Sequence, residues 1–252
     1  MVESASRRKD GKVVAIVAAA GAGHRLGADL PKAFVRVGDY TLLQHTLRRI
    51  DASGAVDEII IMAAFEMCAT AQEQARALDL STPVRVFPGG TLRSDSIYEG
   101  LKYVMRDDAD DTVGIVLIHD AARCFAPAEL FTEVTEKVRS IMAEDAAAGV
   151  IPVLPMVDTV KMVDSADNVL GTPDRTRLRR VQTPQGFDAK LLWTVHQAAK
   201  EEELTTTDDA TLLEKFQLGV TTLPGSDKAF KITTPTDLRL AQLLLEDEED
   251  EG

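Results

Sequence analysis

The sequence predicts an α/β protein in which one mainly parallel sheet lies between two layers of helices. Two observations carry this prediction. Apolar runs rich in β-branched residues recur at 13–18, 58–63, 83–87, 113–118 and 149–155. Between them lie stretches with helical spacing, at 41–50, 66–79, 93–105 and 128–143. Short buried strands that alternate with amphipathic helices are typical of βαβ units around a parallel sheet.

After residue 155 the pattern changes. Short alternating segments with turn signals at Asp167-Asn168, Gly171 and Pro173 predict an extended β-arm at about 156–178. Helical patterns return at 188–201, 207–217 and 236–245, with a short strand at 219–224. The chain is therefore expected to comprise a flexible N-terminal tail (1–12), one domain with its arm (13–245) and an acidic disordered tail (246–252).

The composition limits the class of protein. The 252 residues are 45% hydrophobic, enough for a sizeable core, and carry a net charge of −13. So acidic a chain is not expected to bind nucleic acid or an anionic membrane surface. No apolar run approaches the roughly 20 residues that span a bilayer. The two cysteines, Cys68 and Cys124, form neither a disulfide framework nor a zinc motif, which favours the cytoplasm.

A glycine loop follows the first strand, at the edge where open α/β sheets bind ligands. A dinucleotide-binding G-x-G-x-x-G motif starting at Gly21 would need glycine where Leu26 stands, and a P-loop would need G-K-[ST] at Gly27. What remains is a permissive backbone near Arg25 and Lys32, able to turn N–H groups toward an anion. Pro31 argues against a helix at Lys32 and for a long loop that wraps the ligand. A plain glycine turn with surface cations is the alternative.

Further polar groups follow other strands. Arg93 and Ser96 begin a predicted helix, whose N-terminus favours anions. Asp120 and Arg123 follow the strand at 113–118, where an aspartate can orient a ribose hydroxyl, a metal-bound water or a neighbouring arginine. Each residue alone could equally be a cap or a surface group. Together they predict a polyanion site on an acidic protein, and the later candidates are Arg175, Thr183, Gln185, Thr207 and Lys231.

These blocks together resemble the 2-C-methyl-D-erythritol 4-phosphate cytidylyltransferases. The opening A-A-G-x-G-x-R-[ML]-G motif of that family is matched at 19–27, and its P-K at Pro31-Lys32. Its later motifs are matched in order: G-G-x-x-R-x-x-S at 89–96, H-D-A-A-R at 119–123, D-T at 158–159, D-R at 174–175, T-P-Q at 183–185, T-D-[DE] at 207–209 and K-[IV]-T at 231–233. Two positions depart from the family pattern, Cys124 in place of proline and Phe230 in place of asparagine.

The resemblance implies a fold, an activity and an assembly. The fold is the nucleotidyltransferase version of the Rossmann-like sheet. The enzyme transfers a cytidylyl group from CTP to 2-C-methyl-D-erythritol 4-phosphate in the non-mevalonate isoprenoid pathway, releasing pyrophosphate. It is a homodimer whose arms, at about 156–178, cross between subunits. A cytidylyltransferase for another polyol phosphate, such as ribitol 5-phosphate, and a non-catalytic nucleotide-sensing module are the alternatives.

The resemblance also implies roles for individual residues. Lys32, Arg25 and Lys231 stabilise charge during the transfer. Residues expected to bind CTP are Ala19, Ala20, Gly21, Gly23, Gly90, Ser96 and Asp120. Residues expected to bind the acceptor are Asp120, Arg123, Thr159, Arg175, Thr183 and Thr207, with Thr159 and Arg175 supplied by the partner's arm. Mg²⁺ is expected on the triphosphate, with no side chain assigned as its ligand.

Overall fold

In a computed structural model, which describes residues 11–23, 26, 30–108, 112–144, 149–204 and 206–250, one large sheet forms the centre of the domain. Its strands are β1 (Lys12–Ala19), β4 (Glu58–Ala63), β5 (Val84–Pro88), β6 (Val113–Asp120), β7 (Gly149–Pro155), β10 (Arg179–Val181), β11 (Gln185–Asp188) and β12 (Val220–Pro224). They run in the order β12-β7-β11-β6-β1-β4-β5. Strand β10 pairs with β7 on the same side as β11, nearer the carboxyl end of β7. Among the described strands of this sheet, only β10 and β11 run antiparallel to their neighbours, so the predicted mainly parallel sheet is confirmed.

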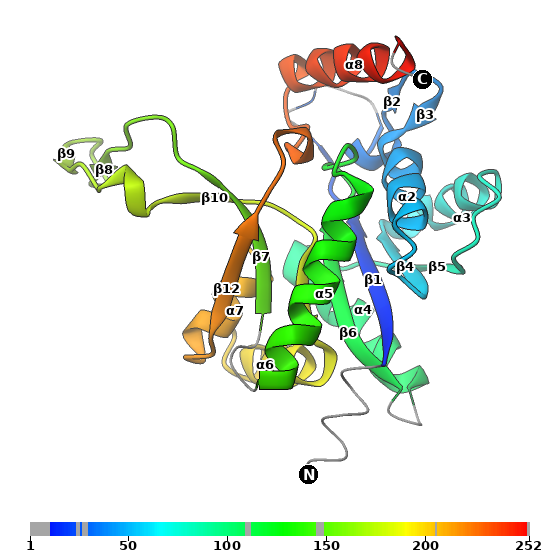
Figure 1. The fold of residues 1–252 in the computed structure, drawn as a ribbon, viewed down its shortest axis with the longest axis horizontal. Helices are drawn as coiled ribbons and strands as arrows, with labels where there is room; N and C mark the ends of the chain where they lie inside the picture. The colour runs from blue at the N-terminus through cyan, green and yellow to red at the C-terminus, as the bar shows by residue number, and fades with distance from the viewer. Residues whose placement is uncertain are drawn as a thin grey trace.

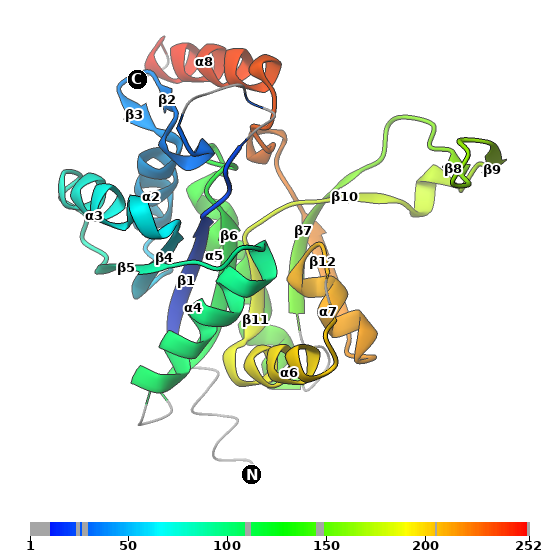
Figure 2. The ribbon, with the colours of Figure 1, turned by 180° about the vertical axis from the view of Figure 1, so that it is seen from behind.

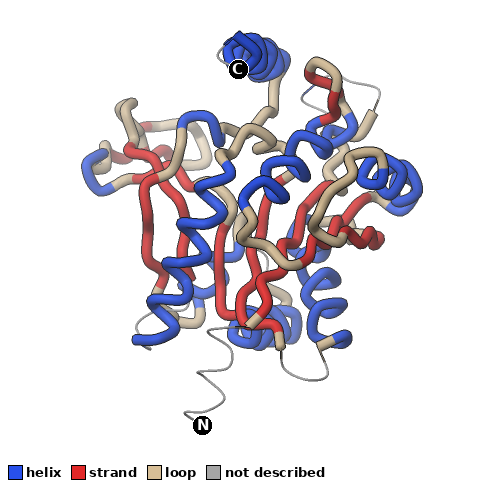
Figure 3. The backbone as a smooth tube through the Cα atoms, turned by 45° about the vertical axis from the view of Figure 1, so that its right-hand side comes forward, coloured by secondary structure: helices blue, strands red, loops and turns tan. Residues whose placement is uncertain are grey.

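Helices cover both faces of the sheet (Figures 1 to 3). One layer consists of α2 (Leu42–Ser53), α3 (Cys68–Arg76) and α5 (Ala128–Glu144), and the other of α4 (Arg93–Asp107), α6 (Ala189–Glu201) and α7 (Asp209–Lys215). Strand β1 shows why both layers form. Val13, Ala15 and Val17 face the first layer, whereas Val14 and Ile16 face the second, because successive side chains of a strand point to opposite faces.

The order of the strands determines where a ligand can enter. From β1 the chain passes through α2 to β4 and through α3 to β5, and then α4 on the opposite face returns it to β6, on the other side of β1. The connections therefore diverge between β1 and β6. In open α/β sheets the crevice at such a switch point, outside the carboxyl ends of the strands, is where ligands bind.

Two small hairpins lie outside the main sheet, β2–β3 (Arg36–Val37 and Tyr40–Thr41) and β8–β9 (Met162–Val163 and Val169–Gly171). The second forms the end of the predicted arm, which leaves the domain after β7 and returns through η4 (Arg175–Arg177) to β10 (Figure 1). The arm exposes apolar side chains to solvent, among them Val157, Val169 and Leu170.

Three sequence predictions need correction. Strand β11 was not predicted, yet its antiparallel backbone fills the sheet between β6 and β7. Pro31 does not prevent helix formation at Lys32: it lies just before a single 3₁₀ turn, η2 (Lys32–Phe34), where its missing N–H costs nothing. The last helix, α8 (Pro235–Asp250), continues five residues beyond the predicted 245, so residues 246–250 are helical and not a disordered tail. Residues 1–10, 251 and 252 lie outside the described part of the chain.

Candidate active site

A cavity of about 520 Å³ opens at the carboxyl ends of β1 and β6. Its size is within the range of cofactor and substrate sites in proteins. The lining includes ten residues that the sequence analysis singled out: Ala19, Ala20, Gly21, Gly23, Lys32, Gly90, Arg93, Ser96, Asp120 and Lys231. Four segments far apart in the sequence thus meet at the switch point of the sheet.

The glycine loop forms one wall of this cavity. Gly23 has a φ of +74°, a conformation that other residues rarely adopt, and a Cβ atom there would lie 2.7 Å from the Cβ of Lys32. The Lys32 N–H donates to the carbonyl of Gly21 at 3.3 Å. Glycine at position 23 therefore allows the loop to fold back tightly, so that Lys32 and the backbone of residues 19–23 line one cavity.

The opposite wall comes from the turn that precedes α4. The Ser96 hydroxyl accepts a hydrogen bond from Gly90 N–H at 3.1 Å and donates to the carbonyl of Leu92 at 3.1 Å. A Cβ atom on Gly90 would lie 2.3 Å from the Cβ of Asp95. This turn is consequently held close against its own helix, with its backbone presented to the cavity.

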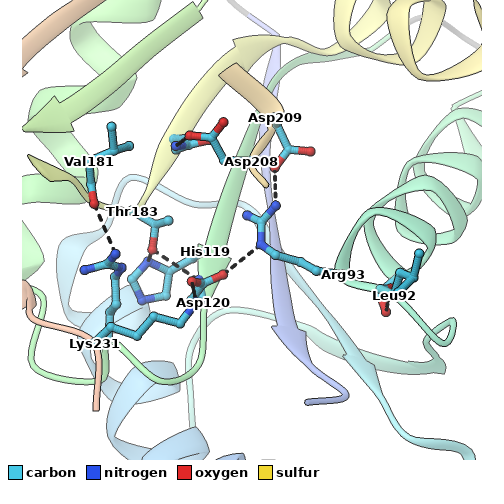
Figure 4. Close-up of polar contacts among 12 residues, drawn as sticks. Leu92, Arg93, His119, Asp120, Val181, Thr183, Asp208, Asp209 and Lys231 are labelled. Carbon is cyan, nitrogen blue, oxygen red and sulfur yellow. Dashed lines mark hydrogen bonds and ion pairs between the residues drawn. The ribbon is translucent and has the colours of Figure 1, made fainter. Parts of the chain in front are cut away.

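A chain of alternating charges, which we call the charge chain, runs from the cavity into the protein and consists of Lys231, Asp120, Arg93, Asp209 and His196. Figure 4 labels its first four members. Lys231 Nζ donates to Asp120 Oδ2 at 2.7 Å, and Arg93 Nε donates to Asp120 Oδ1 at 3.0 Å. Arg93 Nη1 donates to Asp209 Oδ2 at 2.8 Å, and His196 Nε2 donates to Asp209 Oδ1 at 3.0 Å. Asp209 and His196 are buried, whereas Lys231 at the other end is exposed.

The charges of this chain stabilise one another. Burial by itself would raise the pKa of the Asp120 carboxyl, but the charges of Arg93 and Lys231 outweigh it and lower that pKa well below the usual range. Burial would likewise raise the pKa of Asp209, and Arg93 and His196 lower it. Burial would lower the pKa of Arg93, but Asp209 and Asp120 raise it. Both carboxylates are therefore ionised at neutral pH. The sequence pattern places Arg93 among the cations of a polyanion site, but in the structure two carboxylates compensate its charge.

The Asp120 main chain is held by Thr183, which lies in the segment between β10 and β11. The Thr183 hydroxyl accepts from the Asp120 N–H at 3.1 Å and lies 2.9 Å from His119 Nδ1. Burial, opposed in part by the charge of Asp120, lowers the pKa of His119 to about 3. A neutral imidazole can accept the hydroxyl proton at Nδ1, which leaves a Thr183 lone pair for the Asp120 N–H. His119 thus fixes the end of β6 and does not line the cavity.

The other predicted site residues lie away from the cavity lining. Arg123 donates to the carbonyls of Ala229 and Val181, at 2.8 and 3.1 Å, and so ties together the segments before Lys231 and at the end of β10.

Thr207 is exposed just before α7. Thr159 and Arg175 are exposed on the arm, where Arg175 Nη1 donates to the carbonyl of Val157 at 2.7 Å. Arg25 lies outside the described residues.

Sequence reasoning missed Asp209 and His196 as members of this site. Asp209 stands in the matched T-D-[DE] motif, where only Thr207 has an expected role, and His196 stands in none of the matched motifs. In the structure Asp209 Oδ2 reaches Arg93 across 116 positions of the chain. The motif could have drawn attention to Asp209, but no local pattern points to His196.

A glycine loop, two lysines and a compensated aspartate at the switch point of a mainly parallel sheet are typical of the α/β proteins that bind nucleotides or other phosphorylated ligands. The model of the family described as 2-C-methyl-D-erythritol 4-phosphate cytidylyltransferase matches residues 13–247. The chain belongs to this family.

Individual relatives agree with this assignment. Proteins named 2-C-methyl-D-erythritol 4-phosphate cytidylyltransferase from Nocardia farcinica and Rhodococcus jostii are each 45% identical over 237 residues, which is 94% of this chain and 95% and 96% of theirs. The crystal structure of 4-diphosphocytidyl-2C-methyl-D-erythritol synthase from Anaerococcus prevotii superposes with a TM-score of 0.80 at 30% identity. That superposition covers 96% of this chain and 99% of the other.

The buried neutral His119 predicts a pH effect on stability. Because its pKa is lowered from 6.5 to about 3 on folding, the unfolded state binds more protons between these values, and stability falls as pH drops below 6.5. Through His119, the free energy of unfolding should be about 1 to 2 kcal/mol lower at pH 5.5 than at pH 7.5. Urea unfolding of the wild type and His119→Gln at both pH values measures it. The variant, whatever its absolute stability, should lose less than the wild type on acidification, and an equal loss would contradict a neutral His119.

Proposed function

We propose that the cavity at β1 and β6 is where this enzyme carries out the reaction of its family, the transfer of a cytidylyl group from CTP to 2-C-methyl-D-erythritol 4-phosphate with release of pyrophosphate. The observation that carries the proposal is the joint presence of Lys32, Lys231 and the glycine-loop backbone on one cavity. A protein that only senses a nucleotide would not need cations from two separate segments around the phosphates. Ribitol 5-phosphate remains the rival acceptor to be tested.

The chemistry explains the composition of the cavity wall. The attacking group is a phosphate monoester, whose second pKa of about 6 leaves it mostly dianionic at neutral pH, so that no general base is required. None of the described residues that line the cavity is a histidine, cysteine or tyrosine. The barrier lies in bringing two anions together and in the charge that develops on the α-phosphoryl group and the leaving pyrophosphate. Positioning and positive charge are therefore the means of catalysis.

Each wall of the cavity then has a part in the reaction. The backbone of Gly21 and Gly23, with Lys32, holds the triphosphate, and Arg25 is expected to join them. The close backbone at Ala19, Ala20 and Gly90 reads the cytosine edge and leaves little room for a purine. The Ser96 hydroxyl contributes to recognition of the base, because it accepts from the Gly90 N–H and so holds the Gly90 backbone in place. Lys231 acts on the transferring phosphoryl group from the opposite side.

The acceptor would lie beyond the α-phosphoryl group, toward Asp120. We expect Asp120 and Arg123 to bind its hydroxyl groups. Its phosphate would be held by Thr183, Thr159 and Arg175, and Thr207 would complete the pocket. Thr159 and Arg175 lie on the projecting arm of this chain, which supports their assignment to the site of a partner subunit (Figure 2).

The residues of the site are compatible with Mg²⁺ that is bound together with the nucleotide. Among the described residues, no group of three or more His, Cys, Asp or Glu side chains could hold a metal ion. Asp120 is the one carboxylate among the lining residues that the structure describes, and it already accepts from Arg93 and Lys231. An ion bound mainly by triphosphate oxygens and water matches these surroundings and would neutralise charge on the phosphates when bound.

The enzyme is proposed to work as a homodimer in the cytoplasm. Exposed apolar side chains on the arm would be covered by a second copy, and they are Val157, Met162, Val163, Val169 and Leu170. Both cysteines are free thiols, which suits a reducing compartment. No helix in the described part of the chain combines the length and the apolar character needed to cross a membrane.

Lys32 is expected to act mainly in the transition state, where charge redistributes onto the phosphoryl oxygens. Lys32→Ala should lower kcat by on the order of 10²-fold or more, with a smaller change in CTP affinity. Pyrophosphate release from CTP is measured with methylerythritol phosphate and with ribitol 5-phosphate as acceptors. The exposed Lys102→Ala, on α4, is the control and should leave kcat unchanged. A normal kcat in Lys32→Ala would refute this role, and preference for ribitol phosphate would refute the acceptor.

The crossed arm predicts complementation between two inactive variants. If each site takes Lys32 from one chain and Arg175 from the other, Lys32→Ala and Arg175→Ala homodimers should both be nearly inactive. Refolding equal amounts together gives about half heterodimers, each with one intact and one doubly damaged site. Activity per chain should return to roughly a quarter of wild type. No recovery in verified heterodimers would show that Arg175 serves its own chain.

A further inference from the structure

The buried end of the charge chain has no part in the reaction described so far. Asp209 and His196 are 2% and 4% exposed, and neither lines the cavity. Asp209 is the first residue of α7, and His196 lies in α6. Both helices are fixed in the core by buried side chains, among them Leu192, Val195, Leu212 and Leu213. The chain of charges therefore connects an exposed lysine at the cavity to two rigid helices behind it.

Each contact in the charge chain determines which atoms are left for the next contact. Asp209 uses one oxygen for His196 and the other for Arg93 Nη1, at 3.0 and 2.8 Å. Arg93 in turn reaches Asp120 Oδ1 with Nε, on a different edge of its planar guanidinium. Two contacts on separate edges of a rigid fork determine its orientation. Because Asp120 Oδ1 is occupied in this way, Oδ2 is left for Lys231.

We infer that Asp209 and His196 are positioning residues for the cytidylyl transfer: they hold the Arg93 guanidinium so that Asp120 presents one oxygen to Lys231 and keeps its ammonium group at the cavity. This inference rests on the proposed role of Lys231. His196 holds the Asp209 carboxylate, Asp209 holds Arg93, and Arg93 limits how Asp120 can turn.

Loss of the Asp209 charge should rearrange the chain in a definite direction. Arg93 would lose its ion pair with Asp209. Because a guanidinium can bind a carboxylate in bidentate fashion, Arg93 would then compete with Lys231 for both oxygens of Asp120. Lys231 would then lose its position. At the same time the surroundings of the cavity would gain one positive charge, which should not weaken the binding of an anionic nucleotide. Turnover and CTP affinity should therefore change in different ways.

The test compares kcat with CTP affinity in the full-length enzyme. Asp209→Asn should lower kcat at least about 10-fold, because small displacements of a reacting group cost rate steeply, while the Kd for CTP in calorimetry stays equal or falls. Glu214→Gln, an exposed carboxylate-to-amide change on the same helix, should leave both unchanged. Weaker CTP binding with an unchanged kcat in Asp209→Asn would overturn the inference.

A second pair of variants tests His196 and also covers the case in which Asp209→Asn folds poorly. Gln has an N–H donor at a position similar to that of His Nε2, so His196→Gln should keep a kcat near that of wild type. His196→Leu removes the donor and should lower kcat while CTP affinity is retained. Equal kcat values in the two variants would contradict a positioning role.

A double-mutant cycle shows whether Asp209 acts through Lys231. Lys231→Ala alone should lower kcat, and adding Asp209→Asn to it should lower kcat much less than Asp209→Asn does alone, because the group being positioned is already gone. Fully additive losses would overturn the inference and leave the role of Lys231 standing. A normal kcat in Lys231→Ala would instead refute that role, and with it the inference.

Discussion

The site depends on one carboxylate, that of Asp120, which is shared by Arg93 and Lys231. These residues stand at the start of α4, the end of β6 and the segment before α8, and the two ion pairs bring all three segments to one edge of the cavity. Taking ions out of water is costly, and ion pairing offsets that cost only when the geometry is good. We therefore assign the charge chain to orientation rather than to stability: it keeps a lysine at a defined position on an otherwise acidic protein.

The fold holds Asp120 in place from several sides. Its position at the end of β6, next to β1 at the switch point of the sheet, places the carboxylate in the crevice. Thr183, in the segment between the antiparallel strands β10 and β11, accepts from the Asp120 N–H, and the buried neutral imidazole of His119 completes that contact. Arg123 ties the segment before Lys231 to the end of β10 through two carbonyls. The same antiparallel insertion that interrupts the parallel sheet thus supports the catalytic edge.

Much of this could be predicted from the sequence, and the exceptions have physical reasons. Strands β1, β4, β6 and β7 are continuous apolar runs because both of their faces are buried, and β12 was also predicted. Strand β11 is short and contains Gly186, whose open side lies against Val134 and Val138 of α5, so it lacks a β-branched pattern. The helix α8 continues into a run of acidic residues whose composition predicted disorder. The orientation of an arginine by Asp120 was among the expected possibilities, but its partner Arg93 and the links to Asp209 and His196 depend on tertiary contacts that local sequence does not encode.

The central claim is that the Asp120 charge holds Lys231 at the cavity, and its most direct test is a pair of crystal structures, wild type and Asp120→Asn, in the same crystal form. In the wild type, Lys231 Nζ should lie within hydrogen-bond distance of Asp120 Oδ2, as it does here at 2.7 Å. In the variant, Arg93 should stay on Asp209, while Lys231 Nζ should move by on the order of 1 Å or more, enough to impair catalysis. An unchanged Lys231 in Asp120→Asn would contradict the account.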